Sequence, residues 1–147
     1  MTTRTVSLIA LSAPFALATG ATAEQTSDAW DLLAAIEVDE VITGTSYEVR
    51  KVFPTAVENG IEQFDITGYL VPLAEGAEIT DFILISDIGF CPFCGSPEHG
   101  TSLQVSMADP IGYEDGTRVT LRGALEAVTD PETFQTTIMR DASLIDG

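Results

Sequence analysis

The residues best suited to chemistry lie in one short segment, between positions 85 and 100. This segment, ISDIGFCPFCGSPEHG, contains both cysteines of the 147-residue chain and its single histidine. Cys91, Cys94 and His99 fall within nine residues, and their types are those that bind thiophilic metal ions or form a redox-active disulfide. The spacing therefore predicts one shared site rather than three unrelated side chains.

A metal site is the first interpretation of this segment. In a Cys-x-x-Cys motif the two intervening residues form a tight loop, so both thiolates can bind one ion. A Gly-Ser-Pro-Glu stretch follows Cys94 and can turn the chain back, which would bring His99 to the same ion. Thiolate and imidazole ligands favour zinc, and after it copper(I), over magnesium or calcium. For the fourth ligand we expect Glu98, Asp87 or water.

Two other interpretations use the same two sulfur atoms. Cys91 and Cys94 could form a disulfide in a non-catalytic adaptor or structural module. They could also act in a thiol–disulfide oxidoreductase, since Cys-Pro-Phe-Cys resembles the active-site tetrapeptides of thioredoxin-like enzymes. A thioredoxin fold is disfavoured, because Gly95-Ser96-Pro97 stands where its helix would continue and the βαβ pattern is missing.

Other catalytic signals are weak in this sequence. It has no motif for a Ser-His-acid triad, no glycine-rich phosphate loop and no H-E-x-x-H. A cysteine paired with His99 as nucleophile and base would lack a helix dipole or a basic neighbour to support the thiolate. We therefore expect a binding protein rather than an enzyme, with no catalytic residue and no organic cofactor.

The first 23 residues have the features of a secretory signal peptide. Arg4 precedes an apolar run from Val6 to about Ala18, and small residues lead to Ala21-Thr22-Ala23. The apolar run is shorter than the roughly 20 residues that a membrane-spanning helix needs. We expect cleavage after Ala23, a periplasmic or secreted location, and no membrane span in the mature chain.

Residues 24–147 are then expected to form a single, strongly acidic domain. The chain has 6 basic and 23 acidic residues, a formal net charge of −17, and loss of Arg4 would make it −18. Such a charge repels phosphate backbones, so nucleic acid is not an expected partner. Two cysteines allow at most one intramolecular disulfide, which excludes a disulfide-framework protein.

The hydrophobic pattern predicts a mainly β fold with one short N-terminal helix. The helix is expected over residues 28–36, with Asp28 as its N-cap and Trp30 closing one end of the β-structure. After it, the alternation of apolar and polar residues has the period of two that is typical of strands. The expected strands cover residues 45–53, 61–73, 81–87, 102–108, 117–128 and 134–145.

Two glycines indicate how these strands would be shaped. Gly68 and Gly123 each interrupt an apolar face, which suggests a bend or a bulge. Five or six short strands with such bends predict a small antiparallel OB-like barrel, with a β-sandwich as the alternative.

The order of several short motifs resembles a family of small exported bacterial proteins that has no settled function. The matching stretches span about residues 28–145 and are GYLVPL (68–73), DFILIS (81–86), the cysteine-bearing loop (91–97), SLQVSM (102–107) and VTLRGAL (119–125). The resemblance implies a periplasmic, OB-like protein that accompanies transport systems for transition metals, zinc in particular. Components of such a system are the partners it implies, and only the Cys91 loop matches a motif with a functional role.

Overall fold

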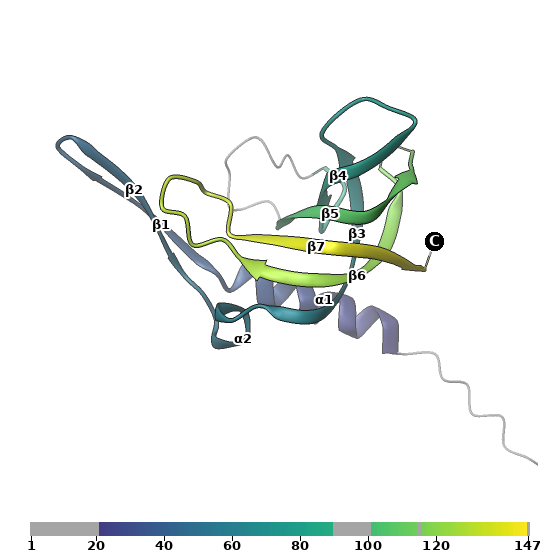
Figure 1. Cartoon of the computed structure of the whole chain (residues 1–147). Coiled ribbons are helices and arrows are strands. Elements are labelled where there is room, and N and C mark those ends of the chain that lie inside the picture. The colour runs from purple at the N-terminus through teal and green to yellow at the C-terminus, as the bar shows by residue number, and fades with distance from the viewer. Residues whose placement is uncertain (1–20, 90–100, 115, 147) are drawn as a thin grey trace, which may run out of the picture.

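The computed structural model describes residues 21–89, 101–114 and 116–146, and it contains a closed β-barrel, a helix packed against it and a separate β-hairpin (Figure 1). The helices are α1 (Ala21–Ala34) and α2 (Thr55–Glu58). The strands are β1 (Glu37–Thr43), β2 (Ser46–Val52), β3 (Ile61–Pro72), β4 (Glu78–Ile85), β5 (Ser102–Gly112), β6 (Arg118–Ala127) and β7 (Thr137–Asp146). None of the helices in these ranges is long and apolar enough to cross a membrane.

The barrel has the strand order β3-β4-β5-β7-β6, and it closes through the pairing of β6 with β3. This confirms the mainly β, OB-like barrel with an N-terminal helix. The expectation that every pair is antiparallel is wrong at one place, because β5 and β7 run parallel. The reason is geometric: around a closed ring of five strands the direction cannot alternate at every step, so at least one neighbouring pair must be parallel.

The core forms because apolar residues alternate along the barrel strands and point inward together. Leu84 on β4, Val105 on β5 and Leu121 on β6 are fully buried. The largest fully buried side chains are Phe82, Ile66, Leu70, Leu84, Leu103, Leu121, Leu125 and Met139, with Val57 of α2 and Val105. A register that slipped by one residue would expose this whole set, so the alternation fixes how the strands pair.

Helix α1 lies along the underside of the barrel in Figure 1 and adds Trp30 and Leu33 to the core. The indole Nε1 of Trp30 donates a hydrogen bond of 2.7 Å to the carbonyl oxygen of Thr67 on β3. Because this polar group is satisfied, the large indole can be buried without an unpaired donor. The helix begins at Ala21 rather than at Asp28, so the expected cap by Asp28 is wrong and that residue lies within the helix.

The two strand glycines have different roles. Gly123 lies where the β6–β7 register shifts, between Arg122 and Ala124, as a bulge requires. Gly68 pairs regularly with Val119, so of the expected bend or bulge the bulge is excluded at this position. A Cβ at Gly68 would lie 2.7 Å from the Ile85 oxygen and 2.9 Å from the indole of Trp30. Gly68 therefore allows β4 and α1 to approach β3 closely.

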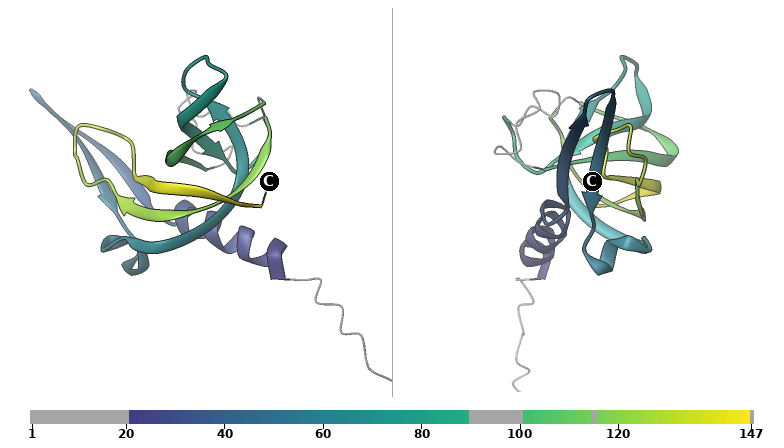
Figure 2. Two further views of the ribbon diagram at one scale, coloured as in Figure 1. Left: turned by 45° about the vertical axis from the view of Figure 1, so that its right-hand side comes forward. Right: turned by 90° about the vertical axis from the view of Figure 1, so that its left-hand side faces the viewer.

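The hairpin of β1 and β2 projects away from the barrel, as the left view of Figure 2 shows. Residues 45–53 were expected to form a strand and do so as β2, whereas β1 was not expected. Of residues 37–52, all of which are described, only Val49 is buried. The hairpin thus gives little to the core and presents most of its surface to solvent.

Candidate functional site

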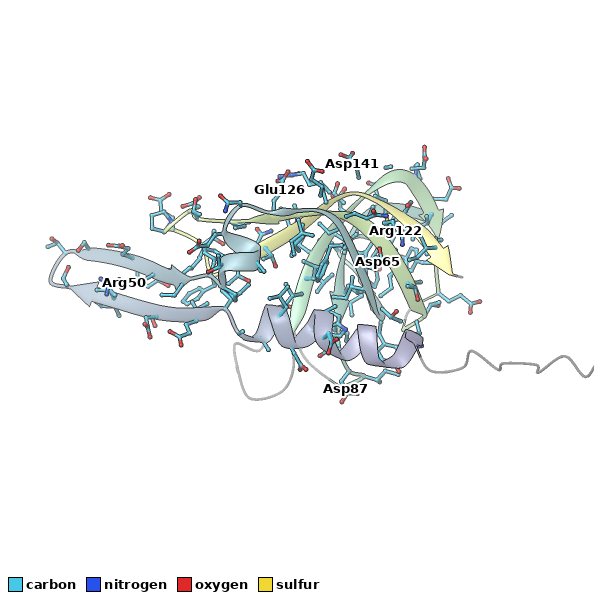
Figure 3. The ribbon with its side chains drawn as sticks, turned by 90° about the horizontal axis from the view of Figure 1, so that it is seen from below. Arg50, Asp65, Asp87, Arg122, Glu126 and Asp141 are labelled. Carbon is cyan, nitrogen blue, oxygen red and sulfur yellow. The ribbon has the colours of Figure 1, made fainter. Side chains whose placement is uncertain are left out.

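Most of the residues expected to bind a metal fall outside the described ranges. Cys91, Cys94, Glu98 and His99 belong to residues 90–100, so their arrangement is not part of the structural description. Asp87, the other expected source of a fourth ligand, is described and exposed just after β4, and its carboxylate points away from the barrel in Figure 3. Within the described ranges, no group of three or more His, Cys, Asp or Glu side chains could hold a metal ion.

The described residues on either side of this segment are held together. Ile85 at the end of β4 pairs with Ser102 at the start of β5. One residue further out, the Ser86 amide donates to the Thr101 oxygen at 3.1 Å, and the Thr101 amide donates to Ser86 Oγ at 3.1 Å. We call Ser86 and Thr101 the stem. The chain therefore leaves the barrel and returns to it at one place, and Asp87 is the first residue beyond the stem.

An open groove of about 250 Å³ begins beside the stem. It lies between the outward side chains of β4 and β5 and the connection from β6 to β7. Ser102, which lines the groove, directly follows Thr101 of the stem. Its lining consists of Ile83, Ser102, Gln104, Phe134, Gln135, Thr136 and Thr137. These hydroxyl and amide groups can donate and accept hydrogen bonds, but none of them is an acid or a base at neutral pH. The polar side chains of this lining can therefore hydrogen-bond a ligand.

Lys51 ties the hairpin to the wall of this groove. Its Nζ donates to the backbone oxygens of Val128, Asp130 and Gln135 at 2.9, 2.8 and 2.7 Å. All three acceptors belong to the connection between β6 and β7. Burial lowers the pKa of Lys51 from its ordinary value, and the charge of Asp130 opposes that change. The carbonyls replace the water that the ammonium loses, so Lys51 acts as a clamp on this connection.

A second set of contacts supports the same junction. The amide of Val49 donates to the Pro131 oxygen at 2.8 Å, and the rings of Tyr47 and Phe134 meet edge to face with centroids 6.3 Å apart. Partial desolvation, then the charge of Glu40 and a hydrogen bond with its carboxylate, raise the pKa of Tyr47. Because Phe134 also lines the groove, the hairpin and the groove share one wall.

The ion pairs of the barrel lie away from the stem. Arg122 on β6 makes two hydrogen bonds of 2.6 Å to the carboxylate of Asp65 on β3, and the two side chains face each other in Figure 3. The Arg122 hydrogen bonds are the main cause that lowers the pKa of Asp65. Arg140 and Glu126 form a similar pair at 2.8 Å. All four side chains are about half exposed, so they link neighbouring strands and do not form a reactive centre.

The clamp, the groove and β1 were missed from the sequence. A signal for β1 was present, because Val38, Val41, Ile42 and Thr43 are residue types that favour strands and a glycine, Gly44, follows them. In the structure Gly44 has a positive φ of 47°. The three acidic residues in that stretch interrupt the apolar alternation from which strands are predicted. No local signal marks Lys51, because its carbonyl partners lie 77 to 84 residues further along the chain.

Comparison with protein-family models, curated proteins and solved structures gives no match to this chain. The chain is a small mainly β protein with a closed five-stranded barrel.

Proposed function

We propose that this protein binds a transition metal through Cys91, Cys94 and His99 and acts as an accessory protein for metal handling. Zinc is the first expected ion and copper(I) the second, because two thiolates and an imidazole suit both. Glu98, Asp87 or water completes the coordination. An open fourth position would allow the ion to pass to a partner.

The observation that best supports this proposal is the stem at Ser86 and Thr101. It holds the two ends of the ligand-bearing segment next to each other, where β4 ends and β5 begins in the closed barrel. Cys91 is five residues beyond Ser86, and His99 is two residues before Thr101. A loop whose ends are already held together loses less conformational entropy when its side chains converge on an ion. The stem would therefore raise metal affinity without any change in the ligands.

The location and partners of the protein belong to the same proposal. A signal peptide over residues 1–23 would deliver the chain to the periplasm or the exterior, where a metal is exchanged with transport proteins. The resemblance to small exported proteins that accompany transition-metal transport points in the same direction. The acidic surface would favour the approach of cations and of basic surfaces on such partners.

The first experiment measures thiols and metal together. Protein isolated from the periplasm under anaerobic conditions is titrated for free thiols and analysed for metal content. The proposal predicts two free thiols and about one equivalent of zinc, because the ligands are thiolates. No free thiol and no metal would instead support a disulfide-pinned adaptor, and dithiol-dependent reduction of insulin would support an oxidoreductase.

The second experiment uses variants that remove one ligand at a time. His99→Ala and Cys91→Ser should each weaken zinc binding by more than about 100-fold, since even changes around a ligand cost 10- to 100-fold. Asp39→Asn, in the hairpin, is the matched control for loss of one acidic charge and should leave the affinity unchanged. If His99→Ala retains full zinc affinity in competition with a chelator, the three-ligand site is refuted.

A further inference from the structure

The outer edge of β1 is a strand edge without a neighbour in the described part of the chain. The hairpin is a two-stranded sheet, and no backbone hydrogen bond among the described residues reaches β1 from any element except β2. A two-stranded hairpin is only marginally stable alone, and an open edge readily pairs with another strand. The Lys51 clamp supports β2, whereas no described residue gives β1 comparable support on its outer side.

The register shows which groups lie on this open edge. In an antiparallel pair, opposed residues either bond to each other or both direct their amides and carbonyls away from the partner strand. Val49 directs its amide outward, to Pro131, and it is opposite Glu40. Glu40 therefore directs its own amide and carbonyl away from β2, and so do Val38 and Ile42, two residues to either side. These three residues offer a row of free donors and acceptors.

The side chains of β1 define what could pair there. One face carries Glu37, Asp39 and Val41, and the other carries Val38, Glu40 and Ile42. Val38 and Ile42 are 38% and 70% exposed. Strand β1 has three acidic residues and no basic one. An added strand would therefore be favoured if it had basic side chains beside Glu37 and Asp39 and apolar ones beside Val38 and Ile42.

We propose that β1 accepts an extended segment of a partner protein in which lysine or arginine alternates with apolar residues, as a third strand of the hairpin. Backbone hydrogen bonds would supply affinity, and the acidic residues of β1 together with the exposed Val38 and Ile42 would select the sequence. A second copy of this chain is a poor occupant, because two acidic edges would face each other in a protein of net charge −17. This docking edge is independent of the proposed metal site.

A synthetic hexapeptide of alternating lysine and valine, capped at both ends, is the probe. Its binding is followed by titration calorimetry, and amide hydrogen exchange reports where it binds. Val38, Glu40 and Ile42 should gain protection, whereas Asp39 and Val41, whose amides bond to β2, should change little. The same peptide methylated at every amide nitrogen keeps its charge and its apolar groups, but it should not bind because it has no strand donors.

Two variants of Glu40 separate backbone pairing from charge. Glu40→Gln keeps the outward amide and should weaken peptide binding only slightly and in a salt-dependent way. Glu40→Pro removes the outward amide but no hydrogen bond to β2, and it should weaken binding by a further factor of about ten. Exchange protection of Asp39 and Val41 in the free variants checks that the hairpin persists.

Three results would overturn the proposal. They are equal binding of the methylated peptide, equal binding by Glu40→Pro and Glu40→Gln with an intact hairpin, and self-association of the protein that protects the β1 edge without peptide. The first two would reduce the effect to charge attraction, and the third would make a second copy the occupant.

Discussion

Replacing Lys51 by methionine should release the β6–β7 connection from the hairpin. The methionine side chain fills most of the space of the lysine stem but has no donor, so the oxygens of Val128, Asp130 and Gln135 lose their shared partner. A hydrogen bond to a charged group contributes about 1.5–3 kcal/mol. Two of the three bonds are partly buried and the third is exposed, so water can replace much of what is lost. The expected loss is therefore about 2 kcal/mol for the junction as a whole.

The amide of Val49 is the reporter for this change, because it bonds to Pro131 across the junction. If opening of the junction becomes easier by about 2 kcal/mol, hydrogen exchange at Val49 should accelerate roughly 30-fold. Amides in the middle of β4, which lie in the barrel, should keep their exchange rates. The thermal midpoint of the barrel should fall by less than a loss of about 2 kcal/mol in global stability would produce, since the hairpin contributes little to the core.

Arg50→Met is the matched control for the loss of a positive charge. Arg50 immediately precedes Lys51 on β2, so its side chain points to the opposite face of the hairpin. Figure 3 labels Arg50 on the hairpin. Its replacement should leave exchange at Val49 within a factor of about three. The clamp would be refuted if Lys51→Met and Arg50→Met accelerated exchange at Val49 equally, because the three carbonyl contacts would then contribute nothing beyond charge.

Two further predictions concern the barrel. Gly68→Ala places a Cβ within 3 Å of backbone and indole atoms and should destabilise the fold by about 1–3 kcal/mol in denaturant unfolding. In Gly112→Ala the nearest contact of the new Cβ would be 3.9 Å, so the free energy of unfolding should stay within about 0.5 kcal/mol of the parent value. Equal effects of the two substitutions would contradict the close approach at β3. The lowered pKa of Asp65 means that its pair with Arg122 stabilises the fold above the ordinary pKa of 3.8 and that this contribution is lost as the pH falls through the folded-state value. Arg122→Met should therefore reduce stability at neutral pH but make little difference at pH values well below that range, and a stability difference that persisted in strong acid would show that the pair is not the cause.

The alternation of side chains made the barrel predictable from the sequence. Val105 and Leu121 lie on clean period-two faces, and both are buried as that pattern requires. The parallel contact of β5 with β7 was not apparent, because it follows from closure of an odd-numbered ring and not from either strand. Gly68 was interpreted from its own strand as a bend or a bulge, whereas the atoms that leave no room for a Cβ there belong to Trp30, Leu84 and Ile85.

The candidate site was predictable only where chemistry is encoded by residue type. Clustered cysteine and histidine residues indicate metal or redox chemistry by their type, so the segment around Cys91 could be identified without knowledge of the fold. The Lys51 clamp uses backbone oxygens, which every residue has, and its partners meet only after the barrel closes. The open edge of β1 can be identified only from the arrangement of the strands, because it depends on which described strands pair with β1.

The position of β7 determines when the barrel can be completed. Among the described strands β7 follows all the others in sequence, yet it lies between β5 and β6 in the ring. Until the ribosome has made β7, no strand connects β5 with β6, and the inward apolar side chains of the barrel remain exposed on that side. Closure of the barrel therefore requires Thr137–Asp146, and a deletion within this strand would disrupt its pairing with both β5 and β6.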